Sequence, residues 1–208
     1  MNFVTTAFRH ADAILIQDEF EDQYRDLLTI IDGISDDDII AQHESYGASN
    51  IERTPKSLSK AINTLLKERF EANGWLSESG IFQDTEYKGD TWRLDFAKDD
   101  ISVEVAFNHS SVIAWNLIKP VLASELNHVQ KAIQTKIGVV ITATNDMKTL
   151  GGFDGAIGTY EKYLDYLPPL QNILTVPLLI IGLTPPETFK VTQEQIAPRK
   201  KIGRIERY

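Results

Sequence analysis

Two carboxylates near the middle of the sequence have the residue type and the spacing for metal chemistry. Asp95 and Glu104 lie nine residues apart, on either side of the charged residues 98–100. From residue 101 to 107, apolar side chains alternate with Ser, Glu and Ala, which is the period of a β-strand. We therefore expect two short strands joined by a charged turn, which would place the two carboxylates together. Such a pair can share a hard divalent cation, the basis of metal-dependent phosphodiester hydrolysis.

Length and composition limit the kind of protein that presents this pair. A chain of 208 residues with 42% hydrophobic residues can bury a full core, and we expect one domain over residues 1–208. No run of about 18 apolar residues is present and the N-terminal residues lack a signal-peptide pattern, so we expect no membrane partner. The absence of cysteine excludes disulfides and thiolate metal sites and fits a cytoplasmic protein.

Charge is distributed unevenly along the chain. The net charge of −9 argues against a protein that coats DNA non-specifically. Residues 184–208, however, carry six basic and three acidic residues, among them Arg199 and Lys200. This basic tail could bind phosphates, or it could be a solubilising C-terminus.

The remaining pattern predicts an α/β domain around the two strands. Apolar residues at helical spacing indicate helices over about residues 10–31 and 57–73, and a short helix opening at 36–38. A mostly helical segment is expected over 111–133, interrupted at Pro120. Continuous apolar runs at 137–141 and 176–183 are typical of buried strands, and a glycine-rich loop, 150–158, leads into a helix over 159–167.

The glycine-rich loop does not have the pattern of a nucleotide site. No Gly-Lys-Ser/Thr follows it and the order of its glycines is not GxGxxG, so we expect no nucleotide cofactor. A serine hydrolase is not indicated either, because the sequence lacks a Gly-x-Ser-x-Gly motif.

Several landmarks occur in an order that is typical of one nuclease group. They are residues 10–15, the helix end 70–75, the strands 95–99 and 103–107, residues 158–161, the run 176–183 and the basic tail ending at Tyr208. With these residues the sequence resembles the type II restriction endonucleases of the BglII and BstYI group, relatives of BamHI in the PD-(D/E)xK nuclease superfamily. The resemblance implies a restriction-endonuclease-like mixed central sheet flanked by helices. It also implies Mg²⁺-dependent hydrolysis of both strands of a short palindromic duplex DNA, leaving 5′-phosphate ends.

The same resemblance assigns roles to individual residues. Asp95 would bridge the metal and the scissile phosphate, Glu104 would be the second metal ligand, and the carbonyl of Val105 a backbone ligand. Glu78 falls at the edge of the active site. The residues expected to bind DNA are Asn108, His109, Ser110, Lys98, Asp154, Arg199 and Lys200.

Ala106 departs from the pattern of the group. At this position, two residues after the second carboxylate, the group has glutamine, BamHI has glutamate and the wider superfamily has lysine. In these relatives the side chain touches the attacking water. Three explanations stay open. In the first, another side chain contacts the attacking water in place of residue 106, with Glu78 as the first candidate and Asn108 or His109 behind it. In the second, Ala106 is an engineered replacement. In the third, the protein binds DNA and cuts it slowly or not at all. A non-catalytic DNA-binding protein and a methylation-dependent endonuclease are therefore the alternatives.

Cutting both strands of a palindrome requires two active sites related by the dyad of the DNA, so a homodimer is expected. The segment 111–133 is apolar on several sides and could form the dimer interface or pack in the core. Its apolar residues are Val112, Ile113, Trp115, Leu117, Val121, Leu122 and Leu126.

Overall fold

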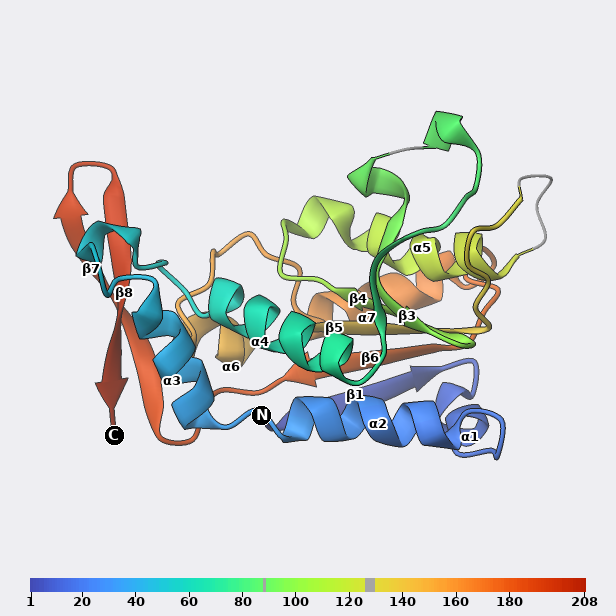
Figure 1. Ribbon diagram of the computed structural model, residues 1–208, viewed down its shortest axis with the longest axis horizontal. Coiled ribbons are helices and arrows are strands. Elements are labelled where there is room, and N and C mark those ends of the chain that lie inside the picture. The colour runs from blue at the N-terminus through green and yellow to red at the C-terminus, as the bar shows by residue number, and fades with distance from the viewer. Residues whose placement is uncertain (88, 126–129) are drawn as a thin grey trace.

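A six-stranded mixed sheet forms the middle of the computed structural model, which describes residues 1–87, 89–125 and 130–208 (Figure 1). The order of the strands is β1-β6-β5-β4-β3-β2. β4, β5 and β6 are parallel to one another, and the other neighbours are antiparallel. The strands are β1 (Phe3–Phe8), β2 (Leu76–Gly80), β3 (Arg93–Lys98), β4 (Ile101–Val105), β5 (Ile137–Ala143) and β6 (Leu178–Leu183).

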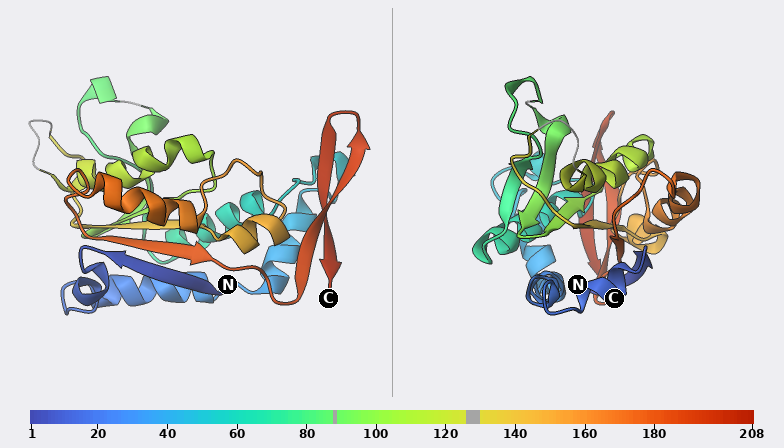
Figure 2. Two further views of the ribbon diagram at one scale, coloured as in Figure 1. Left: turned by 180° about the vertical axis from the view of Figure 1, so that it is seen from behind. Right: turned by 90° about the vertical axis from the view of Figure 1, so that its right-hand side faces the viewer.

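Helices cover both faces of this sheet, with α2 and α4 on one side and α5 and α7 on the other (Figure 2). The helices are α1 (Ala11–Leu15), α2 (Glu21–Asp32), α3 (Asp36–Ser45), α4 (Ser59–Ala72), α5 (Ile113–Ser124), α6 (Asn145–Leu150) and α7 (Tyr160–Leu170). Short 3₁₀ turns occupy Ile51–Arg53, Thr85–Tyr87, Asp90–Trp92 and Ser110–Val112. The expected α/β architecture, a mixed central sheet flanked by helices, is confirmed.

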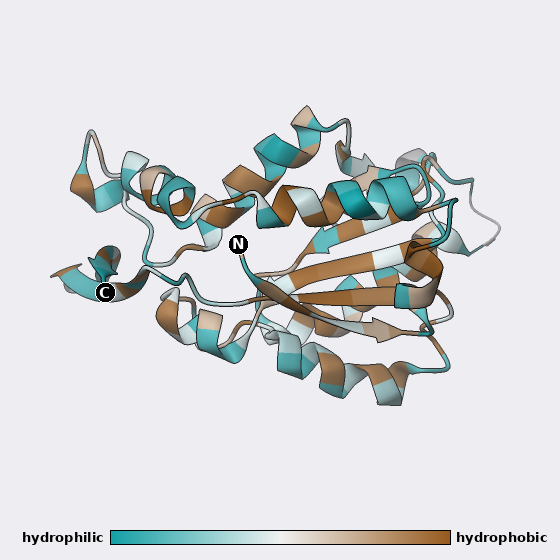
Figure 3. Cartoon of the chain, turned by 90° about the horizontal axis from the view of Figure 1, so that it is seen from below, coloured by the Kyte–Doolittle hydropathy of each residue, from teal (hydrophilic) through white to brown (hydrophobic). Residues whose placement is uncertain are grey.

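The sheet separates two apolar cores because successive strand residues point to opposite faces. In β5, Val139 and Ile141 join the core beneath α2 and α4, whereas Val140 joins the core beneath α5 and α7. Both faces are covered, so the central strands are apolar at nearly every position, as Figure 3 shows. This rigid centre carries β3 and β4, the strands that hold the two carboxylates.

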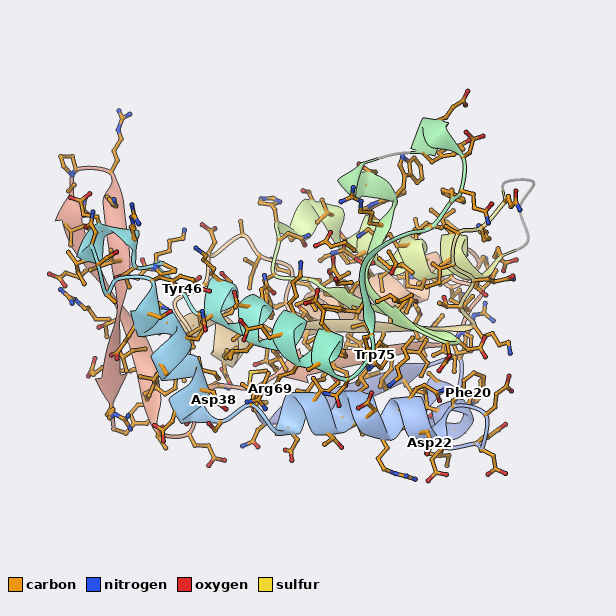
Figure 4. All side chains as sticks on the ribbon, in the orientation of Figure 1. Phe20, Asp22, Asp38, Tyr46, Arg69 and Trp75 are labelled. Atoms are coloured by element: carbon orange, nitrogen blue, oxygen red, sulfur yellow. The ribbon has the colours of Figure 1, made fainter. Side chains whose placement is uncertain are left out.

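Polar contacts fix α2, α3 and α4 against one another. The indole Nε1–H of Trp75 donates to Asp26 at 2.8 Å, and Lys98 donates to the same carboxylate at 2.9 Å. Arg69 reaches Asp38 at 2.7 Å, and Figure 4 shows these two side chains between α3 and α4.

The structure corrects three predicted elements. The helix expected over 10–31 is two helices, α1 and α2, preceded by the edge strand β1. The helix expected over 111–133 ends at Ser124, where Glu125 takes an extended conformation, and Pro120 lies inside α5 without interrupting it. The basic tail is a hairpin, β7 (Phe189–Ala197) and β8 (Lys200–Arg207), that forms a separate sheet beside α3 (Figure 1).

The apolar side of α5 is packed inside the chain itself. Ile113, Leu117 and Val121 are buried in the core beneath α5 and α7, as expected from ordinary core packing. Leu126 lies outside the described residues. Within the part of the chain that the structure describes, no helix is long and apolar enough to cross a membrane.

Candidate active site

Asp95 lies where the pairing of β3 and β4 ends. The paired residues run from Lys98↔Ile101 to Phe96↔Val103, and Asp95 is the next residue along β3. Its Oδ2 accepts a hydrogen bond from the backbone N–H of Val105 at 2.7 Å. Ala106, the next residue, donates its N–H to the carbonyl of Ile141 in β5. Neighbouring residues of a strand direct their backbone groups to opposite edges, so the carbonyl of Val105 faces the β3 side, where Asp95 lies.

Glu104 is buried beneath α5 with only one of its oxygens satisfied. Its side chain is 3% exposed, and Oε2 accepts a hydrogen bond from the ammonium of Lys119 at 2.6 Å. The other oxygen, Oε1, is buried and has no hydrogen-bond partner among the residues that the structure describes. Burial raises the pKa of Glu104 to about 8, and the neighbouring charge of Asp95 adds to the shift. Burial also raises the pKa of Asp95. Both carboxyls therefore lie where a cation would stabilise their charged forms.

A buried polar network lies beside this pair. The amide Nδ2 of Asn116 donates to the hydroxyl of Tyr163 at 2.7 Å and to Oδ1 of Asn108 at 3.2 Å. Burial raises the pKa of Tyr163, so its hydroxyl stays protonated. The network fixes Asn108, one of the predicted DNA-binding residues, directly after β4.

A cavity of about 180 Å³ brings Glu78 together with Asp95. Its lining residues are Asn63, Lys67, Glu78, Asp95, Phe96 and Val105. Glu78 has a positive φ of 52°, and its carboxylate lies 3.9 Å from both Lys67 and Arg93. Sequence reasoning missed Asn63 and Lys67, although their spacing of four residues on a helix indicates a shared polar face. A larger cavity of about 380 Å³ lies near Met1 and contains none of the predicted site residues.

The residues after β4 pair with the glycine-rich loop. Ser110 donates its N–H to the carbonyl of Ala156 at 2.8 Å, and Gly158 donates to the carbonyl of Asn108 at 3.0 Å. Next to this contact, Asp154 forms an ion pair with Lys56 at 2.9 Å, which lowers the pKa of Asp154. The glycine-rich loop therefore lies beside Asn108, His109 and Ser110. Nδ1 of His109 accepts the N–H of Ser111.

Three predicted DNA-binding residues lie apart from this group. Lys98 donates to Asp26 and to the carbonyl of Asn73, so its ammonium braces α2 and α4. Arg199 and Lys200 lie at the turn of the β7–β8 hairpin, where Lys200 forms an ion pair with Glu52 at 3.2 Å. Their contacts with DNA stay predictions.

The donor set fits a hard divalent cation that keeps part of its water shell. In the described residues, no group of three or more His, Cys, Asp or Glu side chains is arranged to hold a metal. Two carboxylates suffice for Mg²⁺, which commonly binds through one or two of them and retains several waters. The unpartnered Oε1 of Glu104 is a buried acceptor of the required type. Ala106, in contrast, is 1% exposed and packs in the apolar core with Ile113 and Leu117.

Comparison with known proteins gives a consistent result. Residues 3–183 match the family model described as restriction endonuclease BglII/BglIII. The fold is similar to the crystal structure of restriction endonuclease BglII complexed with a DNA 16-mer, with a TM-score of 0.68 and 20% identity over 100% of both chains. It is also similar to free BglII, with a TM-score of 0.54 and 19% identity over the same full coverage. The search of curated proteins found no match.

Proposed function

Because this chain belongs to the BglII/BglIII restriction endonuclease family and is a type II restriction endonuclease, we propose that it cleaves both strands of a short palindromic DNA site with Mg²⁺ as cofactor. The products would be 5′-phosphate and 3′-hydroxyl ends. The observation that carries this proposal is the half-buried carboxylate of Asp95 beside the buried carboxylate of Glu104, which has an unpartnered oxygen among the described residues. Mg²⁺ bound there would supply Lewis acidity and lower the pKa of its bound water.

The side chains of the site have separate tasks in this proposal. Asp95, fixed by the N–H of Val105, would hold the cation next to the scissile phosphate. Glu104 and the carbonyl of Val105 complete the protein ligands. Glu78, which lines the same cavity as Asp95, would accept a proton from the attacking water through a relay of solvent.

The DNA would lie across the segments that surround these carboxylates. Asn108, His109 and Ser110 would contact the backbone beside the cut, and Asp154 would face the base edges from the paired loop. The β7–β8 hairpin projects from the body on the same side as residues 81–87 and 89–92 (Figures 1 and 2). Its turn would reach flanking phosphates with Arg199 and Lys200.

Two copies of the chain would act together. A palindrome presents two scissile phosphates related by a dyad, and one active site can reach only one of them, so we propose a two-fold symmetric homodimer. We also place the enzyme in the cytoplasm, where its DNA substrate would be found.

Asp95→Asn tests the proposal. The amide keeps the shape of the side chain and an oxygen that can accept the N–H of Val105, but it removes the charge that binds the cation. We expect cleavage of a mixed-sequence plasmid with Mg²⁺ to fall by at least about 10³-fold, while gel-shift affinity for DNA is retained. Asp99→Asn, in the turn between β3 and β4, makes the same chemical change outside the site and should cut normally.

Full activity of Asp95→Asn would refute the assignment of the metal site. If the natural protein shifts the plasmid on a gel with Mg²⁺ but leaves it intact, the alternative of a non-catalytic DNA-binding protein is correct. Digestion of methylated and unmethylated plasmids in parallel separates the methylation-dependent alternative, and sequencing of the ends identifies the cut position.

A further inference from the structure

The ammonium of Lys119 is a buried cation placed directly on an active-site carboxylate. Lys119 is 8% exposed, and its Nζ lies 2.6 Å from Oε2 of Glu104, which is 2% exposed. A hydrogen bond of this length from a charged donor is strong and fixes the direction of the carboxyl group. Glu104 therefore has one oxygen held by α5, whereas the other, Oε1, is left without a partner.

Lys119 reaches Glu104 because α5 packs very closely on the sheet. Pro120, the next residue, lies against Gly138 of β5, where a Cβ on the glycine would approach the Cβ of Pro120 to 2.5 Å. Ile113 and Leu117 anchor the same helix in the core. The docking of α5, and not the local sequence of β4, thus determines where the ammonium lies.

The position that carries the third residue of related sites is filled by apolar packing. Ala106 is 1% exposed, is surrounded by Ile113, Leu117 and Val121, and has no polar group to offer. Lys119 comes from the helix that covers Ala106 and supplies a fixed positive charge on the same face of the sheet. A carboxylate held by a second protein group in this way binds metal in one orientation.

We propose that Lys119 is a positioning residue of the active site, which holds Glu104 through Oε2 and leaves Oε1 free for the divalent cation. This inference rests on the proposed function, because it gives Glu104 the role of metal ligand. Lys119 acts through Glu104 and is not required to touch the DNA.

Binding of Mn²⁺ to the DNA-free protein, measured by isothermal titration calorimetry, tests the role of Lys119. Lys119→Met keeps the length and apolar stem of the side chain but loses the donor, so Mn²⁺ affinity should fall by about 10–100-fold. Lys119→Gln keeps a donor for Oε2 and should recover most of the loss. Lys136→Met is the matched control, since Lys136 also pairs with carboxylates, Glu19 and Asp100, at an exposed position outside the site. It should bind Mn²⁺ like the natural protein.

A charge-repulsion role predicts the opposite result, because removal of a cation next to the site would tighten Mn²⁺ binding. Unchanged or tighter binding by folded Lys119→Met overturns the inference and leaves the proposed function intact. Absence of Mn²⁺ binding by the natural protein overturns the inference, and plasmid cleavage with Mg²⁺ then decides the proposed function separately. If Lys119→Met does not fold, a crystal structure of the natural protein with Mn²⁺ decides. We expect Oε1 on the metal and Oε2 on Lys119, and the inference is overturned if Lys119 has left Glu104.

Discussion

Gly138→Ala is expected to disturb the active site from the opposite side of α5. The added Cβ would lie 2.5 Å from the Cβ of Pro120 and 2.6 Å from Cδ2 of Leu178. Carbon atoms in ordinary contact lie about 3.5 Å apart, so α5 must move away from β5 by about 1 Å. The same movement would lengthen the 2.6 Å bond between Lys119 and Glu104 to about 3.6 Å, beyond hydrogen-bond distance.

Two measurements follow from this displacement. Overpacking of this kind costs about 1–3 kcal/mol, which for a chain of this size lowers the melting temperature by roughly 2–12 °C. A misplacement of about 1 Å in the site should also lower the single-turnover cleavage rate by about 10–100-fold. Circular dichroism and quenched-flow cleavage with Mg²⁺ measure the two effects.

Gly80→Ala provides the control for this prediction. Gly80 is exposed, and the nearest atom to an added Cβ is the carbonyl oxygen of Phe82 at 3.8 Å, which is ordinary contact. It should melt and cut like the natural protein. If Gly138→Ala melts and cleaves like Gly80→Ala, the docking of α5 does not control the site and the reasoning fails.

Three further predictions concern pH, position 106 and the hairpin. Burial raises the pKa of Glu104 from 4.5 to about 8, so between these values the folded metal-free protein holds a proton that the unfolded chain releases. The stability of the metal-free protein should therefore fall as pH rises through this window. In Glu104→Gln the melting temperature should fall less steeply between pH 5 and 9, and an equal slope in both proteins would disprove the assignment to Glu104. Ala106→Gln buries an amide among apolar side chains, so it should lower the melting temperature and should not raise the cleavage rate. If the variant folds and cleaves DNA faster than the natural protein, Ala106 stands where a functional glutamine belongs. Replacing Arg199 and Lys200 by alanine should reduce the salt dependence of DNA binding by about one unit of slope for each lost phosphate contact, measured by fluorescence anisotropy, and an unchanged slope places the turn away from DNA.

Local pattern was enough to predict the strands that carry the carboxylates. Alternation in residues 101–107 and the charged turn before it predict the β3–β4 hairpin, and the structure has this hairpin. The same pattern does not contain Lys119, which reaches Glu104 from a helix 15 residues later. Lys119 is the one charged residue of the mostly apolar helix α5, and this was the available signal, because a buried lysine requires a charged partner. Which carboxylate it would meet depends on the packing of α5 against the sheet.

The missed elements are those whose partners lie far away in the sequence. β1 is short and half exposed, and it pairs with β6 some 170 residues later, so its own residues give a weak signal. β2 is also mostly polar and becomes a strand by pairing with β3. The hairpin carries polar residues on both faces, which favours the interpretation as a basic tail. Pro120 predicts a broken helix, but the space left by Gly138 lets the proline pack on β5 inside α5.

The β7–β8 hairpin has a consequence for the dynamics of the protein. It shares no strand pairing with the central sheet, and it is joined to the body by contacts such as the hydrogen bond from Gly203 to the carbonyl of Pro55 and the packing of Val191 against Gly152. Phe189, Val191 and Ile202 bury the base of the hairpin, whereas its outer part, residues 192–201, has no buried side chain. Segments with few buried apolar contacts open at lower free energy than the core. Amide protons of this outer part should therefore exchange with solvent through local unfolding, before those of β4, β5 and β6. If this outer part opens independently of the core, double-stranded DNA can enter beside it, and the hairpin can then re-form against the DNA.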